Sequence, residues 1–181
     1  HRLMLENPED VVYGLHILMK ALEVKIGYIG IEINKLDAIK AIEKEAKKYD
    51  NIQVVKLQIK YPQGAEKQLI YACTNREVPS GGLPMDVGVV VNNVATAAQI
   101  AKTIKTGIPL IERITTVTGS CIVEPKNLVI RVGTLVSEII EQCGGLRIDK
   151  KVGKIIMGGP MMGIAQHTAN IPINKGTSGI L

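Results

Sequence analysis

The sequence contains no phenylalanine and no tryptophan, and five tyrosines are the only aromatic residues among its 181 residues. Proteins that bind single-stranded nucleic acid usually present several aromatic side chains on which bases stack. The scarcity of aromatic residues, together with a modest net charge of +5, argues against a nucleic-acid partner. A hydrophobic core must be built from Val, Ile, Leu, Met and Ala, and the hydrophobic content of 46% is sufficient for a globular protein.

Cysteine and long hydrophobic runs are also scarce. Cys73, Cys121 and Cys143 lie too far apart for a short metal-ligand or cluster spacing, and their odd number does not fit a framework of paired disulfides. We interpret them as reduced, mostly buried thiols in a protein of a reducing compartment. No stretch approaches the roughly 18 uncharged apolar residues of a membrane span, and the N-terminus lacks the apolar core of a signal peptide. We therefore expect no direct membrane span.

The two ends of the sequence lead us to expect a piece of a longer protein. The sequence opens at His1 without a methionine, and it stops at the apolar residues Ile180 and Leu181 without a polar tail. On this interpretation, part of the functional site lies outside these residues.

Residues 1–108 alternate between helical and strand patterns. The helices are expected at 8–23, 35–49, 66–73 and 92–105, and the strands at 26–33, 52–59 and 87–91. Asn7 is the expected N-cap of the first helix, and Glu43 and Lys47 form an expected i,i+4 pair in the second. Helices that alternate with strands through short connections indicate βαβ units, so we predict an α/β domain with a mainly parallel sheet.

The composition changes near residue 107, because fourteen of the 18 glycines lie from Gly81 onward. Beyond this point the patterns predict strands at 110–117, 127–132 and 154–157 and a helix at 134–142, which Gly144 and Gly145 end in left-handed conformations. This order of elements predicts a small α+β module over residues 109–181.

Several classes of chemistry find no support. The three histidines have no ligand spacing with a third His, Cys or carboxylate, so a metal site is not expected. The four serines lack the Gly-x-Ser-x-Gly frame of a nucleophile elbow, which excludes a hydrolase of that kind. We assign no catalytic residue.

Polar residues gather in two predicted strand-to-helix turns. Tyr61, Gly64 and Glu66 lie in one turn, whereas Asn92, Asn93 and Thr96 lie in or just after the other. In open parallel sheets, ligands bind at the carboxyl ends of strands, where helix N-termini present free backbone N–H groups. The plainer alternative is that the two asparagines only cap a helix and that Glu66 is a first-turn carboxylate. The residues by themselves leave both alternatives open.

Four segments carry a resemblance to a known family: 61–69, 76–84, 87–97 and 175–180. They closely resemble the C subunit of the Rnf electron-transport complex, and they are more distantly similar to the flavin-bearing, NADH-binding subunit of respiratory complex I. The resemblance implies a Rossmann-like NADH- and FMN-binding domain over residues 1–108. It also implies a β-grasp module of the soluble-ligand-binding type over residues 109–181.

The resemblance also implies a set of cofactor-binding residues: Tyr61, Gly64, Glu66, Val91, Asn92, Asn93 and Thr96. One departure is Ala65, which stands where the complex I pattern has a first glutamate. The glycine-rich phosphate loop and the cysteine-rich cluster segment of the family are absent from this sequence, which has no Cys-x-x-Cys. We therefore expect FMN, NAD(H) and 4Fe–4S clusters in the full-length protein only, and no tightly bound cofactor in this chain.

The function that the resemblance implies is electron transfer between NAD(H) and iron–sulfur clusters through FMN. The implied partners are other Rnf subunits and ferredoxin or a flavin-carrying protein, and the implied location is the cytoplasmic face of the cell membrane. Two alternatives remain open at this point. The chain is a docking scaffold without its own redox site, or it is a fragment of the related cobalamin reductase.

Overall fold

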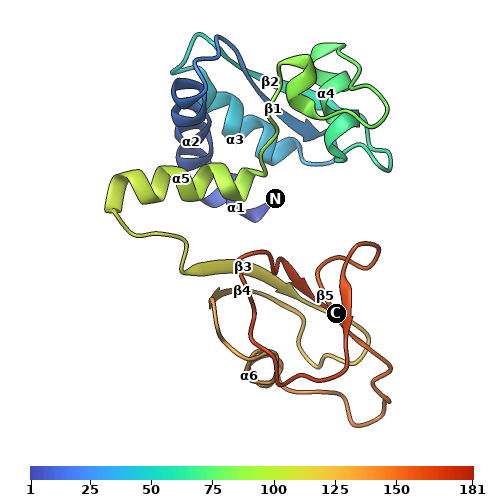
Figure 1. Cartoon of the computed structure of the whole chain (residues 1–181). Coiled ribbons are helices and arrows are strands. Elements are labelled where there is room, and N and C mark those ends of the chain that lie inside the picture. Colours follow the sequence, from blue (N-terminus) through green and yellow to red (C-terminus); the bar gives the residue numbers. More distant parts are fainter. The chain divides into compact units, whose positions relative to one another are not determined.

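The computed structural model describes all residues from His1 to Leu181. They form two compact units, His1–Ile108 and Pro109–Leu181 (Figure 1). None of the helices combines the length and the apolar character that crossing a membrane requires.

The first unit contains a two-stranded parallel sheet. Its elements are α1 (Arg2–Glu6), α2 (Pro8–Ala21), β1 (Gly27–Glu32), α3 (Leu36–Ala46), β2 (Ile52–Leu57), α4 (Glu66–Thr74), the 3₁₀ turn η1 (Pro84–Val87) and α5 (Val94–Thr106). The strands pair from Gly27 opposite Ile52 to Glu32 opposite Leu57. The prediction of a parallel sheet is therefore confirmed.

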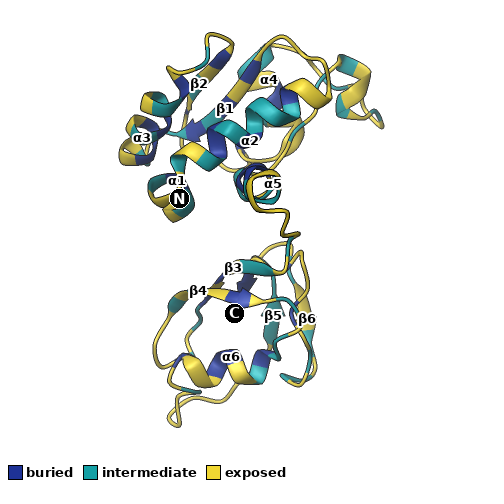
Figure 2. Ribbon diagram, turned by 90° about the vertical axis from the view of Figure 1, so that its left-hand side faces the viewer, coloured by how far each residue is buried: buried dark blue, intermediate teal, exposed yellow.

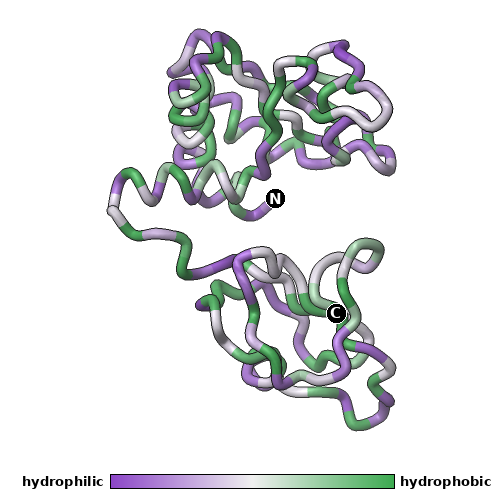
Figure 3. The backbone as a smooth tube through the Cα atoms, viewed as in Figure 1, coloured by the Kyte–Doolittle hydropathy of each residue, from purple (hydrophilic) through white to green (hydrophobic).

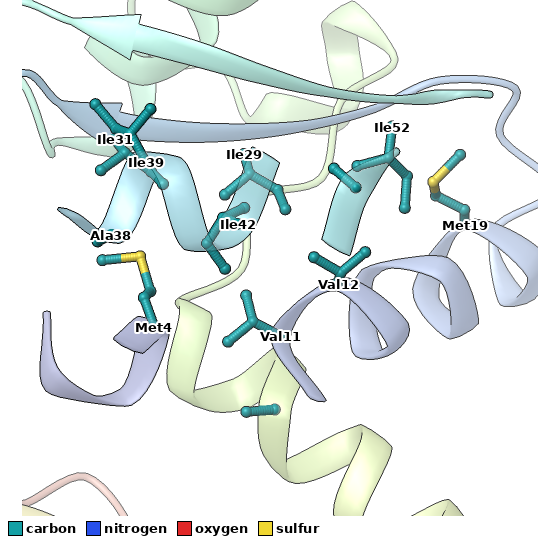
Figure 4. Close-up of a cluster of buried hydrophobic side chains, with 12 residues drawn as sticks. Met4, Val11, Val12, Met19, Ile29, Ile31, Ala38, Ile39, Ile42 and Ile52 are labelled. Carbon is teal, nitrogen blue, oxygen red and sulfur yellow. The ribbon is translucent and has the colours of Figure 1, made fainter. Parts of the chain in front are cut away.

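Helices cover both faces of β1, as is usual for parallel strands. On one face, Ile29 and Ile31 pack with residues of α1, α2 and α3 in a continuous hydrophobic core. Figure 4 shows Val11 and Val12 of α2 on the side of this core opposite the strand. On the other face, α4 comes so close that a Cβ on Gly30 would lie 2.7 Å from the Leu69 side chain. Gly30 therefore lies against the end of the Leu69 side chain of α4.

The backbones of helices α2 and α5 lie close together. A Cβ on Gly14 of α2 would lie 1.8 Å from the carbonyl oxygen of Ala97 in α5. Ala98 and Ala101 are buried on the same helix, with relative exposures of 7% and 0%. Small side chains on both helices therefore permit this contact.

The second unit contains a mixed five-stranded sheet with one helix. Its elements are β3 (Glu112–Val117), β4 (Lys126–Arg131), α6 (Val136–Gln142), β5 (Ile155–Met157), β6 (Ile164–Gln166) and β7 (Gly179–Ile180), with the strand order β4-β3-β7-β5-β6. β7 is parallel to β3, and the other pairs are antiparallel. Figure 2 shows buried residues on α6 and on the strands of this unit.

The core of the second unit joins α6 to the central strands. Val136, Ile139 and Ile140 of α6 are buried together with Val117 and Ile180. The hydroxyl of Thr115, a fully buried residue of β3, donates a 3.0 Å hydrogen bond to the Thr177 carbonyl. The C-terminal segment is thereby attached to the centre of the sheet.

Several local predictions were wrong. Residues 87–91 do not form a strand, since Val87 ends a 3₁₀ turn and the following residues are in no sheet. The expected ion pair between Glu43 and Lys47 is absent, because the Glu43 carboxylate lies 3.3 Å from Lys56 Nζ of β2. Asn7 occupies the N-cap position of α2, but its side chain makes no capping hydrogen bond.

The sequence patterns also missed short elements. Helix α1 and the strands β6 and β7 were not predicted, and each has five residues or fewer. Such short elements carry too few residues for a periodic pattern. The predicted left-handed conformations of Gly144 and Gly145 are confirmed, with φ angles of 78° and 82°.

Candidate functional site

The first unit contains a pocket of about 760 Å³. Its walls come from α2, from the first half of β1, from α4, and from the segment 88–93 that leads into α5. Most of these walls are apolar, and Leu15, Leu69 and Val90 are typical of them. Large, mostly apolar pockets with a few polar groups are the usual form of a small-molecule site.

The two turns that the sequence singled out both contribute residues to the pocket. Gly64 and Glu66 line it from the start of α4, whereas Val91, Asn92 and Asn93 line it from the start of α5. The tertiary structure therefore brings five of the seven predicted residues to one pocket. The segments that contain them are more than 20 residues apart in the sequence.

The start of α4 is a tight turn without a side-chain cap. The Gln63 N–H donates to the Lys60 carbonyl and the Ala65 N–H to the Pro62 carbonyl, both at 2.8 Å. Ala65 is the N-cap residue and offers no side-chain acceptor. The first backbone N–H groups of α4 therefore have no capping partner beside the exposed Glu66 carboxylate. Such groups can bind an anionic or polar atom of a ligand.

The two adjacent asparagines have different roles. Asn93 is the N-cap of α5, and its Oδ1 accepts a 2.9 Å hydrogen bond from the Ala95 N–H. The capping alternative is therefore correct for Asn93. Asn92 is exposed and lines the pocket, and no hydrogen bond of its side chain to the protein is found. Its amide is free to bind a polar atom of a ligand.

Gly64 lies against open space. A Cβ at this position would have no heavy atom within 4 Å, and its φ angle is not in the left-handed region. Neither backbone conformation nor packing against the protein therefore requires glycine here. The remaining physical reason for a glycine on a pocket wall is close approach of a ligand to the backbone.

Two predicted residues lie away from the pocket. Tyr61 is 77% exposed and does not line the pocket, although it belongs to the same turn as Gly64. Thr96 lies in the first turn of α5, is exposed, and is likewise not a lining residue. Both residues belong to segments from which other residues line the pocket, but their own side chains do not line it.

Three further residues of the pocket carry chemical groups that the sequence patterns did not single out for the site. Cys73 and Lys25 line it, as does Arg76, whose Nη1 donates a 2.8 Å hydrogen bond to the Val87 carbonyl. This bond ties the end of α4 to the segment that leads to Asn92. Arg76 lies in one of the segments that carry the family resemblance, which is the signal that points to it.

The cysteines are free, and burial affects two of them. Cys143 is fully buried and Cys73 is partly buried, and in both cases burial raises the pKa of the thiol. The thiolate is the reactive form, so at pH 7.5 we expect iodoacetamide to label both residues more slowly in the native chain than in urea.

Labelling of the native thiols should accelerate as the pH rises through their raised pKa values, and therefore at a higher pH than in the unfolded chain. Mass spectrometry of tryptic peptides after timed labelling measures this. Equal rates in the native and unfolded chains would contradict the prediction.

The asparagine pair provides a stability prediction. Replacement of Asn93 by Ala removes the cap of α5 and should lower the free energy of unfolding by about 1 kcal/mol. Asn92→Ala is the matched control, because no hydrogen bond of that side chain holds the fold together. Urea unfolding followed by circular dichroism measures both variants. If the two variants lose the same stability, the capping bond has no energetic role.

No histidine lines the pocket. The ring of His16 lies 4.7 Å from that of Tyr49, centroid to centroid, within the helical layer. No group of three or more His, Cys, Asp or Glu residues could hold a metal ion.

Family models match both units. Residues 1–102 match the Nuo51 FMN-binding domain, and residues 114–165 match the SLBB domain. Part of the NAD⁺-reducing [NiFe]-hydrogenase in its H2-reduced state has a similar structure, with a TM-score of 0.77 at 16% identity. That similarity covers 99% of this chain and 37% of the hydrogenase chain. At this level of identity the similarity shows the fold alone.

Two curated relatives match the entire chain. The C subunit of the Na⁺-translocating ferredoxin:NAD⁺ oxidoreductase complex of Acetobacterium woodii is 52% identical over 181 residues. The C subunit of the proton-translocating ferredoxin:NAD⁺ oxidoreductase complex of Clostridium ljungdahlii is 54% identical over 181 residues. The chain spans 40% and 39% of the lengths of these relatives. The chain belongs to the Nuo51 FMN-binding domain family and is similar along its whole length to the C subunits of ion-translocating ferredoxin:NAD⁺ oxidoreductase complexes.

Proposed function

We propose that this chain forms one wall of an FMN and NAD(H) site in a subunit that transfers electrons between NAD(H) and ferredoxin. The observation that carries the proposal is the pocket in which Gly64, Glu66, Asn92 and Asn93 meet, within the region that matches an FMN-binding domain. On this proposal residues 1–108 belong to a Rossmann-like domain and residues 109–181 to a β-grasp module.

The residues of the pocket fit a flavin. Its apolar walls suit a flat ring system, the Asn92 amide and the N–H groups at the start of α4 suit polar atoms at the rim, and Gly64 leaves room for close approach. When bound, FMN supplies the conversion between a hydride and single electrons. The protein's part is to hold the ring, exclude water with the apolar walls, and bind the polar rim.

The NAD(H) contacts involve a single carboxylate at the start of α4, because Ala65 replaces the first glutamate of the complex I pattern. Glu66 keeps the second carboxylate and lines the pocket. We assign to Glu66 the hydrogen bonds to the nicotinamide nucleotide. The iron–sulfur clusters belong to the remainder of the protein, since the chain has no Cys-x-x-Cys.

For the second unit we propose a docking role toward other subunits of the complex. Met161, Met162 and Ile164 are 73%, 86% and 70% exposed in and beside a glycine-containing loop of this unit. Clusters of exposed apolar side chains are typical of interaction surfaces. Through such contacts the subunit would be held at the inner face of the membrane, with ferredoxin or a flavin-carrying protein as its redox partner.

The site proposal is tested by flavin binding to the whole gene product. We expect Asn92→Ala and Glu66→Ala to lower flavin content and NADH oxidation at least about tenfold, which corresponds to about 1.4 kcal/mol. Glu77→Ala is the control, because Glu77 is an exposed carboxylate outside the pocket.

If both pocket variants keep full flavin content and NADH oxidation, the chain is a scaffold without its own redox site. Titration of FMN against the 181-residue chain should give weak binding or none. Tight binding by this chain would show that it contains the complete site.

A further inference from the structure

An exposed loop connects α6 to β5 in the second unit. Every residue from 146 to 154 is exposed. In Figure 3 the colour changes between hydrophobic and hydrophilic along this loop, which projects from the body of the second unit at the bottom of the view. We call residues 146–154 the basic loop, because they include Arg147, Lys150, Lys151 and Lys154.

Ile148 lies in the turn of the basic loop. Its relative exposure is 103%, so no other part of the chain covers its side chain. The residues on either side of it, Arg147 and Asp149, are joined by two hydrogen bonds of 3.1 and 3.0 Å from the guanidinium to the carboxylate. A large apolar side chain in water gains free energy when it enters an apolar environment. Ile148 therefore favours contact with a surface outside the chain.

The base of the basic loop is attached to the second unit. The Arg147 N–H donates a 2.8 Å hydrogen bond to the Cys121 carbonyl. Leu146 forms an isolated antiparallel bridge with Ile122, which is itself buried in the core of this unit. The loop therefore projects from a defined place on the unit.

The basic loop has an excess of positive charge. Its four basic residues stand against one acidic residue, Asp149, which is paired with Arg147. No ion pair is found for Lys150, Lys151 or Lys154. Anionic headgroups attract unpaired lysines, and the boundary between headgroups and acyl chains accepts an apolar side chain. One fully exposed isoleucine beside unpaired lysines therefore fits the surface of an anionic bilayer.

We propose that the basic loop binds an anionic phospholipid surface, with Ile148 inserted at the headgroup boundary and the three unpaired lysines against acidic headgroups. A protein partner fits less well, because a stable protein interface buries about 800 Å² on each side, whereas this loop offers a single isoleucine in a narrow turn. The contact is made by this chain itself and depends neither on the flavin site nor on docking to other subunits.

Sedimentation of the whole gene product with lipid vesicles tests the proposal. We expect the protein to bind vesicles of equal parts phosphatidylglycerol and phosphatidylcholine more tightly than vesicles of phosphatidylcholine alone. Joint replacement of Lys150, Lys151 and Lys154 by Gln should lower the partition coefficient on the anionic vesicles about 100-fold, since each lysine near such a surface contributes about fivefold. Added salt should weaken the binding of the native protein.

Two matched controls accompany these variants. Joint replacement of Lys40, Lys44 and Lys47 by Gln makes the same change in charge at exposed lysines of the first unit and should leave the partition coefficient unchanged. Ile148→Gln should lower it at least about tenfold. Val129→Gln, which changes a residue that is 67% exposed on β4, is the control for the isoleucine and should have no effect.

Equal losses by the two triple lysine variants would overturn the proposal, because binding would then follow total charge. Unchanged binding by Ile148→Gln would overturn it as well, since nothing would then be inserted. Failure of the native protein to bind anionic vesicles would also overturn it and would leave an acidic protein as the partner of the loop. Flavin content is measured on the same variants and should not change, because the basic loop does not line the pocket.

Discussion

Replacement of Gly64 by valine should weaken FMN binding to the whole gene product at least about tenfold, or about 1.4 kcal/mol. The new side chain would project from a wall of the pocket into space that no protein atom occupies within 4 Å. Because no protein atom is displaced, the fold should tolerate the change, and the loss should fall on the ligand alone. Fluorescence titration of FMN measures the dissociation constant.

Gly153→Val is the matched control for this experiment. A Cβ on Gly153 would likewise have no heavy atom within 4 Å, and the residue has no left-handed φ angle, but it lies in the second unit and does not line the pocket. Its replacement should leave the FMN dissociation constant unchanged. Unchanged binding by Gly64→Val would place the ligand away from this turn and contradict the proposed site.

Replacement of Gly14 by alanine should destabilise the first unit by about 3 kcal/mol, the upper part of the usual cost of overpacking. The added Cβ would lie 1.8 Å from the Ala97 oxygen and 2.4 Å from its carbonyl carbon. A backbone clash cannot be relieved by a change of rotamer, so α2 and α5 must move apart. The gain of about 1 kcal/mol in helix propensity is too small to offset this.

Thermal and urea unfolding followed by circular dichroism measure the effect of Gly14→Ala. Gly64→Ala is the control with the same chemical change, because it adds a methyl group where nothing lies within 4 Å. We expect this control to keep or slightly raise the stability of the native state. If Gly14→Ala and Gly64→Ala have equal midpoints, the added methyl group at residue 14 is accommodated without loss of stability, which would contradict the prediction.

Periodicity was sufficient for the long elements of the chain. The apolar spacing in α2 and α3 and the β-rich sequences of β1 and β2 predicted these elements to within a few residues at each end. A buried face imposes its own repeat on the sequence. The strand predicted at residues 87–91 was wrong. A hydrophobic sequence favours a strand, but a strand also needs a hydrogen-bonded neighbouring strand, and the sequence by itself does not supply one.

Some features of the candidate site are also predicted by the sequence, whereas others are shown only by the structure. The turns at Gly64 and Asn92 are visible in the sequence because strand ends and helix starts have local signatures. The separate roles of Asn92 and Asn93 are not visible in the sequence. The two residues are identical in type, and only the structure shows that Asn93 is the one that caps α5. Cys73 and Arg76 reach the pocket through the packing of α4 on β1, which is a contact between distant parts of the chain.

The sequence by itself determined the helical and strand segments, the parallel character of the first sheet, the resemblance to the C subunit of the Rnf electron-transport complex, and the two turns at which ligands are expected. These features follow from local spacing and from motifs. Only the tertiary structure decided which side chains of those turns share one pocket, that Gly14 lies against the α5 backbone, and that β1 keeps an unpaired edge. Each of these depends on how distant segments pack, and local sequence does not encode such contacts in a readable pattern.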